Sequence, residues 1–318
     1  MTSARILLDC DPGYDDAAAI LLAAGTPGVE LLGITTVAGN QTIEKVTKNA
    51  LRIARLVKLD KVPVARGSDR PLVREKIVPA ADIHGESGLD GVELPPLPEN
   101  WESLLDRRTA VELIIDTLMT EPAGTVTLVP TGPLTNIALA ALTEPRIVER
   151  AKEVVLMGGG LHTGNVGPMS EFNIENDPEA AAVVFGLPWR VTMVGLDLTY
   201  QARATLEVRE RIARIGTPAA ALLSQILEEF AITYKKSRGF DAPPLHDPCA
   251  LACVIDPDVM KVVQVPIRVE TKGELTTGMT VADFRRAPAP DCHTWAATEL
   301  DQARFWNLMA EAAARIPA

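Results

Sequence analysis

The 318-residue sequence predicts an α/β fold, in which an open, mostly parallel sheet is flanked by helices. Short runs rich in Leu, Ile and Val alternate along the chain with segments of helical composition, as in parallel α/β proteins. Most of these runs are apolar throughout, which is typical of strands covered on both faces. Polar or glycine residues follow each run, so we expect ligands to bind beyond the carboxyl ends of the strands.

The first strand and helix set the pattern for the rest of the chain. Residues 5–9 form an apolar run that ends in an acid, and a Pro-Gly turn follows. Asp15 and Asp16 then open the Ala- and Leu-rich residues 17–24, which indicates a helix start. Further strands are predicted at residues 31–37, 62–65, 125–129, 154–157 and 191–194, and further helices at residues 43–57, 134–142, 180–185 and 301–315.

Two stretches depart from this alternation. Residues 71–99 are rich in Gly, Pro and charged residues, and residues 237–247 separate two predicted helices. Loops of this length in a compact domain are commonly functional or mobile. Residues 262–298 show short strands and proline-rich turns. Because the chain has no internal repeat and no linker, we expect residues 1–318 to form a single domain.

Composition narrows the class of protein. The formal net charge of −11 argues against a nucleic-acid or anionic-membrane partner, because both bind clustered Lys and Arg. The four cysteines are scattered, so we expect no disulfide framework. No run is long and apolar enough to span a bilayer. The acidic motif begins at Asp9, too early for a cleavable leader, and we expect a cytoplasmic protein.

Four aspartates crowd the end of the first strand and the start of the first helix. Asp9, Asp11, Asp15 and Asp16 lie within eight residues and repel one another. A helix N-terminus offsets less than about 2 kcal/mol per charge, whereas a bound cation offsets far more. Oxygen ligands favour a hard ion, calcium or magnesium. The alternative is helix capping beside a solvated acidic turn.

Two later segments add candidate residues. Asp247 precedes a predicted helix, where it is either an N-cap or a metal ligand, and the adjacent His246 can supply a proton near neutral pH. Residues 165–177 are rich in amides and carboxylates, which bind vicinal hydroxyls, so we predict a sugar-binding loop. The glycine run at residues 158–160 lacks the Lys and Ser or Thr of a phosphate loop.

Seven segments resemble, in order, the sequence blocks of the inosine-uridine-preferring nucleoside hydrolases. The run at residues 9–17 looks like the signature of that family. The resemblance extends to about residue 255 and implies a Rossmann-like sheet and hydrolysis of ribonucleosides to ribose and nucleobase. The other blocks are Val37-Ala38-Gly39-Asn40, residues 84–91, residues 130–136, Met157-Gly158-Gly159, Glu171-Phe172-Asn173 and His246-Asp247-Pro248.

The resemblance also implies a metal site and a catalytic pair. One calcium ion per subunit would be bound by the carboxylates of Asp11, Asp16 and Asp247 and the main-chain carbonyl of Thr131. The ribose diol and a water would complete the shell, and Asp11 would be the general base that deprotonates this water. His246 would lie near the leaving base as a candidate acid. Family members are commonly homotetramers or dimers, so we expect self-association.

A further set of residues would contact the nucleoside. Within it, His84 would lie in a mobile loop over the nucleobase, and the carboxylates and amides would bind the ribose. The transition state of such a cleavage resembles an oxocarbenium ion, and we expect no covalent intermediate because a water is at hand. The full set is Asp15, Asn40, His84, Met157, Asn165, Glu171, Phe172, Asn173 and Tyr234.

Two aromatic positions bear on the preferred base. Tyr234 lies twelve residues before His246, where broad-specificity members resemble this chain and pyrimidine-preferring members tend to have Gln. We therefore favour a broad, inosine- and uridine-like preference over a pyrimidine-specific one. Phe230 departs from the Tyr of a close match and lacks its hydroxyl. The alternative role for both rings is packing of a helix face against the core.

Two other functions fit part of the pattern. A haloacid-dehalogenase-like magnesium phosphatase also begins with a strand that ends in Asp-x-Asp, here Asp9 and Asp11, but the helix-starting lysine of that class is missing. A calcium-dependent nucleoside-binding protein without catalysis would not need Asp11, Asp247 and His246 together.

Overall fold

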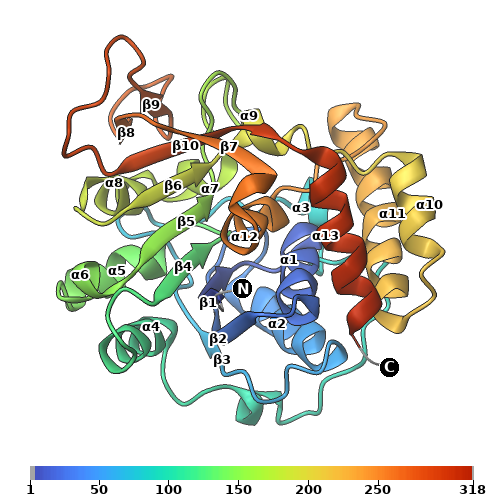
Figure 1. Ribbon diagram of the computed structural model, residues 1–318. Helices are drawn as coiled ribbons and strands as arrows, with labels where there is room; N and C mark the ends of the chain where they lie inside the picture. The colour runs from blue at the N-terminus through green and yellow to red at the C-terminus, as the bar shows by residue number, and fades with distance from the viewer. Residues whose placement is uncertain (1–3, 317–318) are drawn as a thin grey trace.

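The computed structural model describes residues 4–316 and is built on an eight-stranded sheet (Figure 1). The strand order is β3-β2-β1-β4-β5-β6-β10-β7. Every neighbouring pair is parallel except β10 with β7, so the predicted open, mostly parallel sheet is confirmed. The strands are β1 Ala4–Cys10, β2 Val29–Thr36, β3 Val64–Arg66, β4 Val126–Pro130, β5 Glu153–Met157, β6 Val191–Val194, β7 Met260–Gln264 and β10 Thr294–Leu300.

Strand β1 lies where the strand order reverses. It pairs with β2 on one side and with β4 on the other, because the chain builds outward to β3 and then returns. In open α/β sheets such a switch point leaves a crevice beyond the carboxyl ends of the strands. Asp9 and Cys10 end β1, so the acidic motif enters this crevice.

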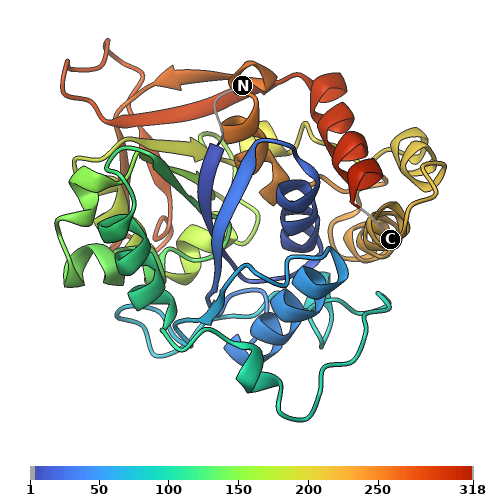
Figure 2. The same cartoon turned by 60° about the horizontal axis from the view of Figure 1, so that its bottom comes forward.

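Helices cover both faces of the sheet, as Figure 2 shows. Along β1, Ile6 and Leu8 belong to one apolar core and Leu7 to the other, as the alternation of side chains in a strand requires. The first core includes helices α1 Tyr14–Gly25, α2 Ile43–Leu56, α11 Pro218–Arg238, α12 Asp247–Ile255 and α13 Gln302–Arg315. The second includes α4 Ala110–Thr120, α5 Thr135–Thr143, α6 Ile147–Arg150 and α8 Pro178–Gly186.

The C-terminal part contributes more to the sheet than its sequence indicates. Strand β10 pairs with β6, and β7 lies antiparallel at the edge. Strands β8 Ile267–Val269 and β9 Thr280–Ala282 form a separate antiparallel pair. From β9, the Thr280 hydroxyl bonds both the N–H and the carbonyl of Gly160, at 2.9 and 2.6 Å, and so supports the loop after β5. The remaining helices are α7 Phe172–Asn176, α9 Leu196–Thr199 and α10 Leu206–Ala213, with 3-10 turns at η1 Trp101–Leu104 and η2 Pro257–Val259.

Helix α11 begins and ends as its sequence dictates. The Thr217 hydroxyl accepts a bond from the N–H of Ala220, the third residue of the helix, and Pro218 occupies the first turn. Gly239 ends the helix with a φ of +75°, a conformation that favours glycine. The predicted irregular segment follows, up to α12. Phe230 and Tyr234 therefore lie one turn apart on the buried face of α11.

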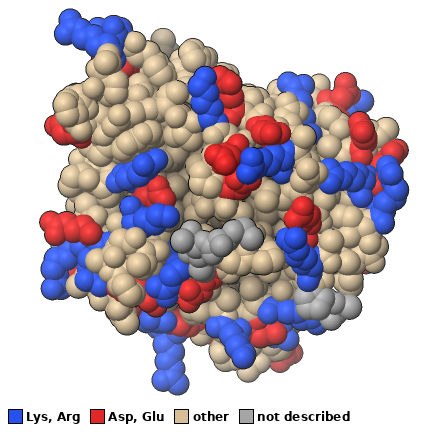
Figure 3. Space-filling model, viewed as in Figure 1, with Lys and Arg blue, Asp and Glu red and all other residues tan. Residues whose placement is uncertain are grey.

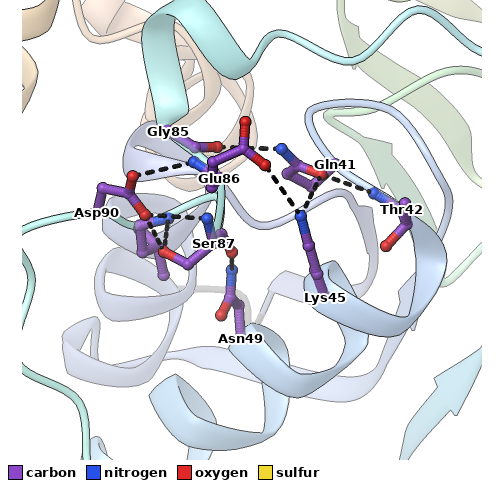
Figure 4. A network of polar contacts seen from close by, with 9 residues as sticks. Gln41, Thr42, Lys45, Asn49, Gly85, Glu86, Ser87 and Asp90 are labelled. Atoms are coloured by element: carbon purple, nitrogen blue, oxygen red, sulfur yellow. Dashed lines mark hydrogen bonds and ion pairs between the residues drawn. The ribbon is translucent and has the colours of Figure 1, made fainter.

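The segment at residues 71–99 contains one short helix, α3 Ala81–His84, and is otherwise irregular. Figure 4 shows how polar contacts tie it to helix α2. The Asn49 amide donates to the carbonyl oxygens of Pro12, at 3.1 Å, and Ser87, at 2.9 Å. Other contacts join Gln41 to Gly85, Lys45 to Glu86, and Asp90 to Glu86 and Ser87. The network holds the segment against the turn of the acidic motif.

Charged side chains are interspersed on the molecular surface. Figure 3 shows Lys and Arg beside Asp and Glu over the face it presents. Many form ion pairs, such as Arg5 with Glu30 at 2.7 Å. Exposed pairs of this kind contribute only about 0–1 kcal/mol each. Between residues 4 and 316, no helix combines the length and the apolar composition needed to cross a membrane.

Candidate active site

The polar residues that follow the strands converge on one pocket. Helices α11 and α12 and the segment at residues 71–99 supply the other walls. Thr131, His246 and Asp247 line the pocket, while Asp11 and Asp16 are fully buried. All the residues expected to contact the nucleoside line it: Asp15, Asn40, His84, Met157, Asn165, Glu171, Phe172, Asn173 and Tyr234.

Three carboxylates form a compact buried group. Oxygens of Asp15, Asp16 and Asp247 lie within 4.8 Å of one another. The first two come from the first turn of α1 and the third begins α12, so two helix N-termini meet at the group. The ligand set implied by the resemblance contains Asp11 and not Asp15. In the structure Asp11 borders the group, and its N–H donates to Asp16 Oδ1 at 3.3 Å.

Burial raises the pKa of the carboxyls in this cluster. It raises the pKa of Asp15 to about 7, and the charge of Asp16 adds to the effect. Burial also raises the pKa of Asp11 and of Asp247 well above the usual range, with neighbouring carboxylates acting in the same direction. Several buried charges of one sign destabilise the folded protein, and a bound cation offsets this repulsion.

Unpartnered oxygens test whether these residues fit a metal ion. Asp11 Oδ1 and Asp15 Oδ1 are buried and accept no hydrogen bond from any residue that the structure describes. Buried polar atoms normally have partners, so these two oxygens mark a place for a cation or a bound hydroxyl. Carboxylate and carbonyl oxygens are the ligands that calcium prefers. The residues present therefore fit a hard divalent cation.

Thr131 connects the acidic cluster to the sheet. Its hydroxyl donates to Asp16 Oδ1 at 2.8 Å, and its N–H donates to the Asp9 carbonyl at 2.8 Å. The carboxylate of Asp9, at the end of β1, accepts a hydrogen bond from the side-chain amide of Asn136 at 2.8 Å. The Thr131 carbonyl accepts from Asn173 Nδ2 at 2.7 Å. Asp9 thus belongs to a supporting layer of hydrogen bonds beneath the pocket.

The carboxylate of Asp11 is fixed through one oxygen. Its Oδ2 accepts the N–H of Asn40 at 2.6 Å, and the Asn40 amide donates to Asp16 Oδ2 at 3.1 Å. Two glycines make room for this carboxylate. A Cβ at Gly39 would lie 2.1 Å from Asp11 Oδ2, and one at Gly132 would lie 2.6 Å from Oδ1. Both glycines are therefore part of the site.

The predicted sugar-binding loop at residues 165–177, called the sugar-side loop below, is organised by its own polar groups. Glu171 caps helix α7 and accepts from the N–H groups of Gly159, at 2.8 Å, and Asn173, at 2.9 Å. Burial raises the pKa of Glu171 to about 7. Asn165 Oδ1 accepts the N–H of Phe172 at 2.9 Å. These bonds fix the loop while the same side chains line the pocket.

Aromatic rings form the opposite wall. His84 and Phe230 stack with ring centroids 5.9 Å apart, and Tyr14 packs 5.5 Å from both. The N–H of Tyr14 donates to His84 Nδ1 at 3.2 Å. Phe230 is fully buried and also meets Tyr234 edge-on at 5.0 Å. Phe230 therefore has two roles: it packs the buried face of helix α11, and it lines the pocket.

His246 lies between two hydroxyl groups. Its Nδ1 is 2.8 Å from the Thr199 hydroxyl and its Nε2 is 2.9 Å from the Tyr234 hydroxyl. Burial lowers the pKa of His246 to about 3, and the pKa of His84 to about 3 as well. Both rings are therefore neutral near pH 7 in the absence of bound substrate.

The raised pKa of Asp15 predicts how the metal-free protein responds to pH. The folded state keeps the Asp15 proton up to about pH 7, whereas the unfolded chain loses it near its ordinary pKa of 3.8. Stability contributed by this group is therefore present at low pH and is lost as pH rises through that interval. We expect the metal-free wild type to lose more free energy of unfolding between about pH 5 and 7.5 than Asp15→Asn does.

Urea unfolding in chelator measures this difference. The buried histidines act in the opposite direction in both proteins, so the comparison with Asp15→Asn reports the Asp15 carboxyl group together with its effect on the neighbouring carboxyls of Asp11 and Asp247. Equal pH slopes for the two proteins would contradict the expected protonation of Asp15.

Three parts of the site have no clear signal in the sequence alone. Gly39 and Gly132 look like ordinary turn glycines until their distances to Asp11 are known. Arg238, at the end of α11, also lines the pocket. Thr199 follows a predicted strand but acts through His246, which is distant in sequence. Only the fold brings these residues together.

The chain is similar to known nucleoside hydrolases over nearly its whole length. The family model described as inosine-uridine preferring nucleoside hydrolase matches residues 6–307. The inosine-uridine preferring nucleoside hydrolase of Crithidia fasciculata is 53% identical over 98% of both chains. The pyrimidine-specific ribonucleoside hydrolase RihA of Escherichia coli is 42% identical over 96% of this chain and 97% of its own.

A solved structure supports the same assignment. The purine-preferring ribonucleoside hydrolase from Gardnerella vaginalis matches with a TM-score of 0.90 at 33% identity, over 98% of both chains. These similarities decide against the phosphatase and against a binding protein without catalysis. The chain therefore belongs to the inosine-uridine preferring nucleoside hydrolase family, and it is an enzyme that hydrolyses the N-glycosidic bond of ribonucleosides to ribose and nucleobase.

Proposed function

We propose that this enzyme depends on calcium and uses Asp11 as the general base toward the attacking water. The observation that carries the proposal is the unpartnered Asp11 Oδ1 beside the buried carboxylates of Asp15, Asp16 and Asp247. One calcium ion per subunit, bound by Asp11, Asp16, Asp247 and the Thr131 carbonyl, would lower the pKa of a water and orient the ribose diol.

Asp11 is suited to take a proton. Its Oδ2 is fixed by the N–H of Asn40, while Oδ1 has no donor among residues 4–316. One oxygen therefore sets the orientation and the other is available for the proton. A positioned carboxylate of this kind contributes about 10²–10⁴-fold to such a step.

Asp15 and the sugar-side loop account for ribose binding. Asp15 Oδ1 is buried, lies at the pocket and lacks a donor within the described chain, so it can accept a ribose hydroxyl. We assign the remaining ribose contacts to the polar residues of the wall, with Met157 and Phe172 beside the sugar. These polar residues are Asn40, Asn165, Glu171 and Asn173.

Bond cleavage places positive charge on the sugar and negative charge on the base. The acidic cluster stabilises an oxocarbenium-like sugar, and the water attacks the face opposite the base. This attack forms the new C–O bond directly, so no ribosyl-enzyme adduct is needed. His84, His246 and Tyr234 lie on the aromatic side of the pocket, where they would meet the leaving base.

We propose a broad base preference of the inosine and uridine type. The relative from Crithidia fasciculata, at 53% identity, is named for that preference, whereas the one at 42% is named pyrimidine-specific. Tyr234 at the pocket is consistent with the broad type, and Phe230 removes one hydroxyl from the same wall. We also propose that the protein is cytoplasmic and that it forms a homo-oligomer, a tetramer or a dimer. Light scattering of the purified protein would test the oligomeric state.

A substrate panel tests the function. We expect the wild type to release base and ribose from inosine, adenosine, uridine and cytidine at different rates, and to lose this activity in chelator. Inactivity on all four nucleosides with calcium present would overturn the proposal. Unchanged activity in chelator would overturn the calcium dependence alone.

Substitution of Gly39 is expected to displace the general base, Asp11, while leaving its carboxylate group chemically unchanged. In Gly39→Ala the added Cβ would overlap Asp11 Oδ2, which lies 2.1 Å away, so the carboxylate must move. We expect kcat for inosine to fall at least about tenfold, because small displacements of a catalytic group are costly. Steady-state kinetics on folded protein measures the effect. Gly186→Ala is the matched control, since no atom lies within 4 Å of its Cβ, and equal rates for the two variants would contradict the assignment.

A further inference from the structure

Three side chains from separate elements form a buried chain of hydrogen bonds on the leaving-group side. The Thr199 hydroxyl of α9 lies 2.8 Å from His246 Nδ1, and His246 Nε2 lies 2.9 Å from the Tyr234 hydroxyl of α11. Thr199 is completely buried, whereas Tyr234 and His246 line the pocket. The chain therefore has a closed end at Thr199 and an open end at the pocket.

The direction of these bonds follows from counting donors. A ring nitrogen that carries a hydrogen donates and one that does not accepts, so the direction of each bond shows the state of the nitrogen that makes it. If the ring donated to Thr199, the threonine hydrogen would need another acceptor, and no other is present among the described residues. If Thr199 donates to Nδ1, then Nε2 donates to Tyr234. The remaining hydrogen, on Tyr234, then points to the pocket, where a substrate can accept it.

We propose that Thr199 is a positioning residue that holds His246 in its Nε2–H form and thereby makes Tyr234 the hydrogen-bond donor to the departing nucleobase. The inference rests on the proposed function. As the glycosidic electron pair moves to the base nitrogen, the Tyr234 hydroxyl stabilises the negative charge that develops on the base. Phe230, one turn earlier on α11, offers no hydroxyl, which increases the importance of Tyr234.

Comparison of two leaving groups tests the proposal. Inosine has a poor leaving group, whereas 4-nitrophenyl β-D-ribofuranoside releases a stable anion that needs no donor. We expect Thr199→Val to lower kcat/KM for inosine about tenfold and for the aryl riboside less than about threefold. Thr199→Ser retains the hydroxyl and should stay near the wild type on both substrates. Tyr234→Phe should show the same selective loss, and the double variant should be no worse than Tyr234→Phe.

A spectroscopic measurement keeps the test independent of how the variants fold. ¹⁵N NMR of the wild type should show the His246 proton on Nε2, and a proton on Nδ1 would overturn the proposal. An equal loss on both substrates in folded Thr199→Val, or no loss on inosine, would also overturn it. If the wild type cleaves neither substrate, the proposed function fails with it; if the wild type is active and only the selectivity is absent, this inference alone fails.

Discussion

Asp11→Asn is expected to lower kcat for inosine by about 10²–10⁴-fold, which is the range of a positioned general base. Asparagine keeps the shape of aspartate, and its carbonyl oxygen can still accept the N–H of Asn40. The amide cannot take a proton from water, so the chemical step loses its base while the pocket keeps its form. A stopped or continuous assay of hypoxanthine release measures kcat, and thermal melting shows whether the fold is retained.

Two controls separate the loss of the base from a general loss of charge or of metal. Asp283→Asn removes one charge from an exposed ion pair with Arg285 and should leave kcat unchanged. Saturating calcium separates a weakened metal site from a missing base, since added metal restores only the former. A kcat for Asp11→Asn within about threefold of the wild type would assign the base to another residue.

Asp247→Asn is expected to remove most of the stabilisation of the protein by calcium. Asp247 lies in the compact carboxylate group, and its replacement removes one charged ligand. With calcium at 100 times the wild-type Kd, a 100-fold weaker affinity would reduce the stabilisation by calcium from about 2.7 to about 0.4 kcal/mol. The metal-free variant should melt no lower than the metal-free wild type, because one buried like charge is gone. Activity should fall in parallel.

Differential scanning fluorimetry with and without calcium follows this effect. Asp258→Asn, an exposed acid shortly after α12, is the matched control and should keep the full calcium shift. A wild-type calcium shift in Asp247→Asn would place the cation elsewhere.

The first strand and helix can be predicted from sequence because their signals are local. An apolar run, a Pro-Gly turn and two acids before an Ala-rich stretch fix β1 and α1 within a few residues. The sheet edge that carries the site follows from the same alternation of strands and helices. Asp247 is a candidate because a histidine precedes it at a helix start, and it lies beside the α1 aspartates as the resemblance implies.

Other features depend on contacts between distant parts of the chain. Strand β10 pairs with β6 and β7 although its sequence shows only a short strand, because pairing is set by tertiary packing. The closeness of Gly39 and Gly132 to Asp11 exists only once three strand ends meet. Asp15, not Asp11, completes the compact carboxylate group, which reflects the side-chain directions in the first turn of α1.

Calcium titration of the metal-stripped enzyme tests the central claim most directly. Chelator-treated wild type would receive calcium stepwise while hypoxanthine release from inosine and calcium binding are both recorded. We expect no measurable release without metal, and activity that rises in proportion to occupancy up to one calcium ion per chain. Full activity in the stripped enzyme, or calcium binding that leaves the rate unchanged, would contradict calcium-dependent catalysis at this site.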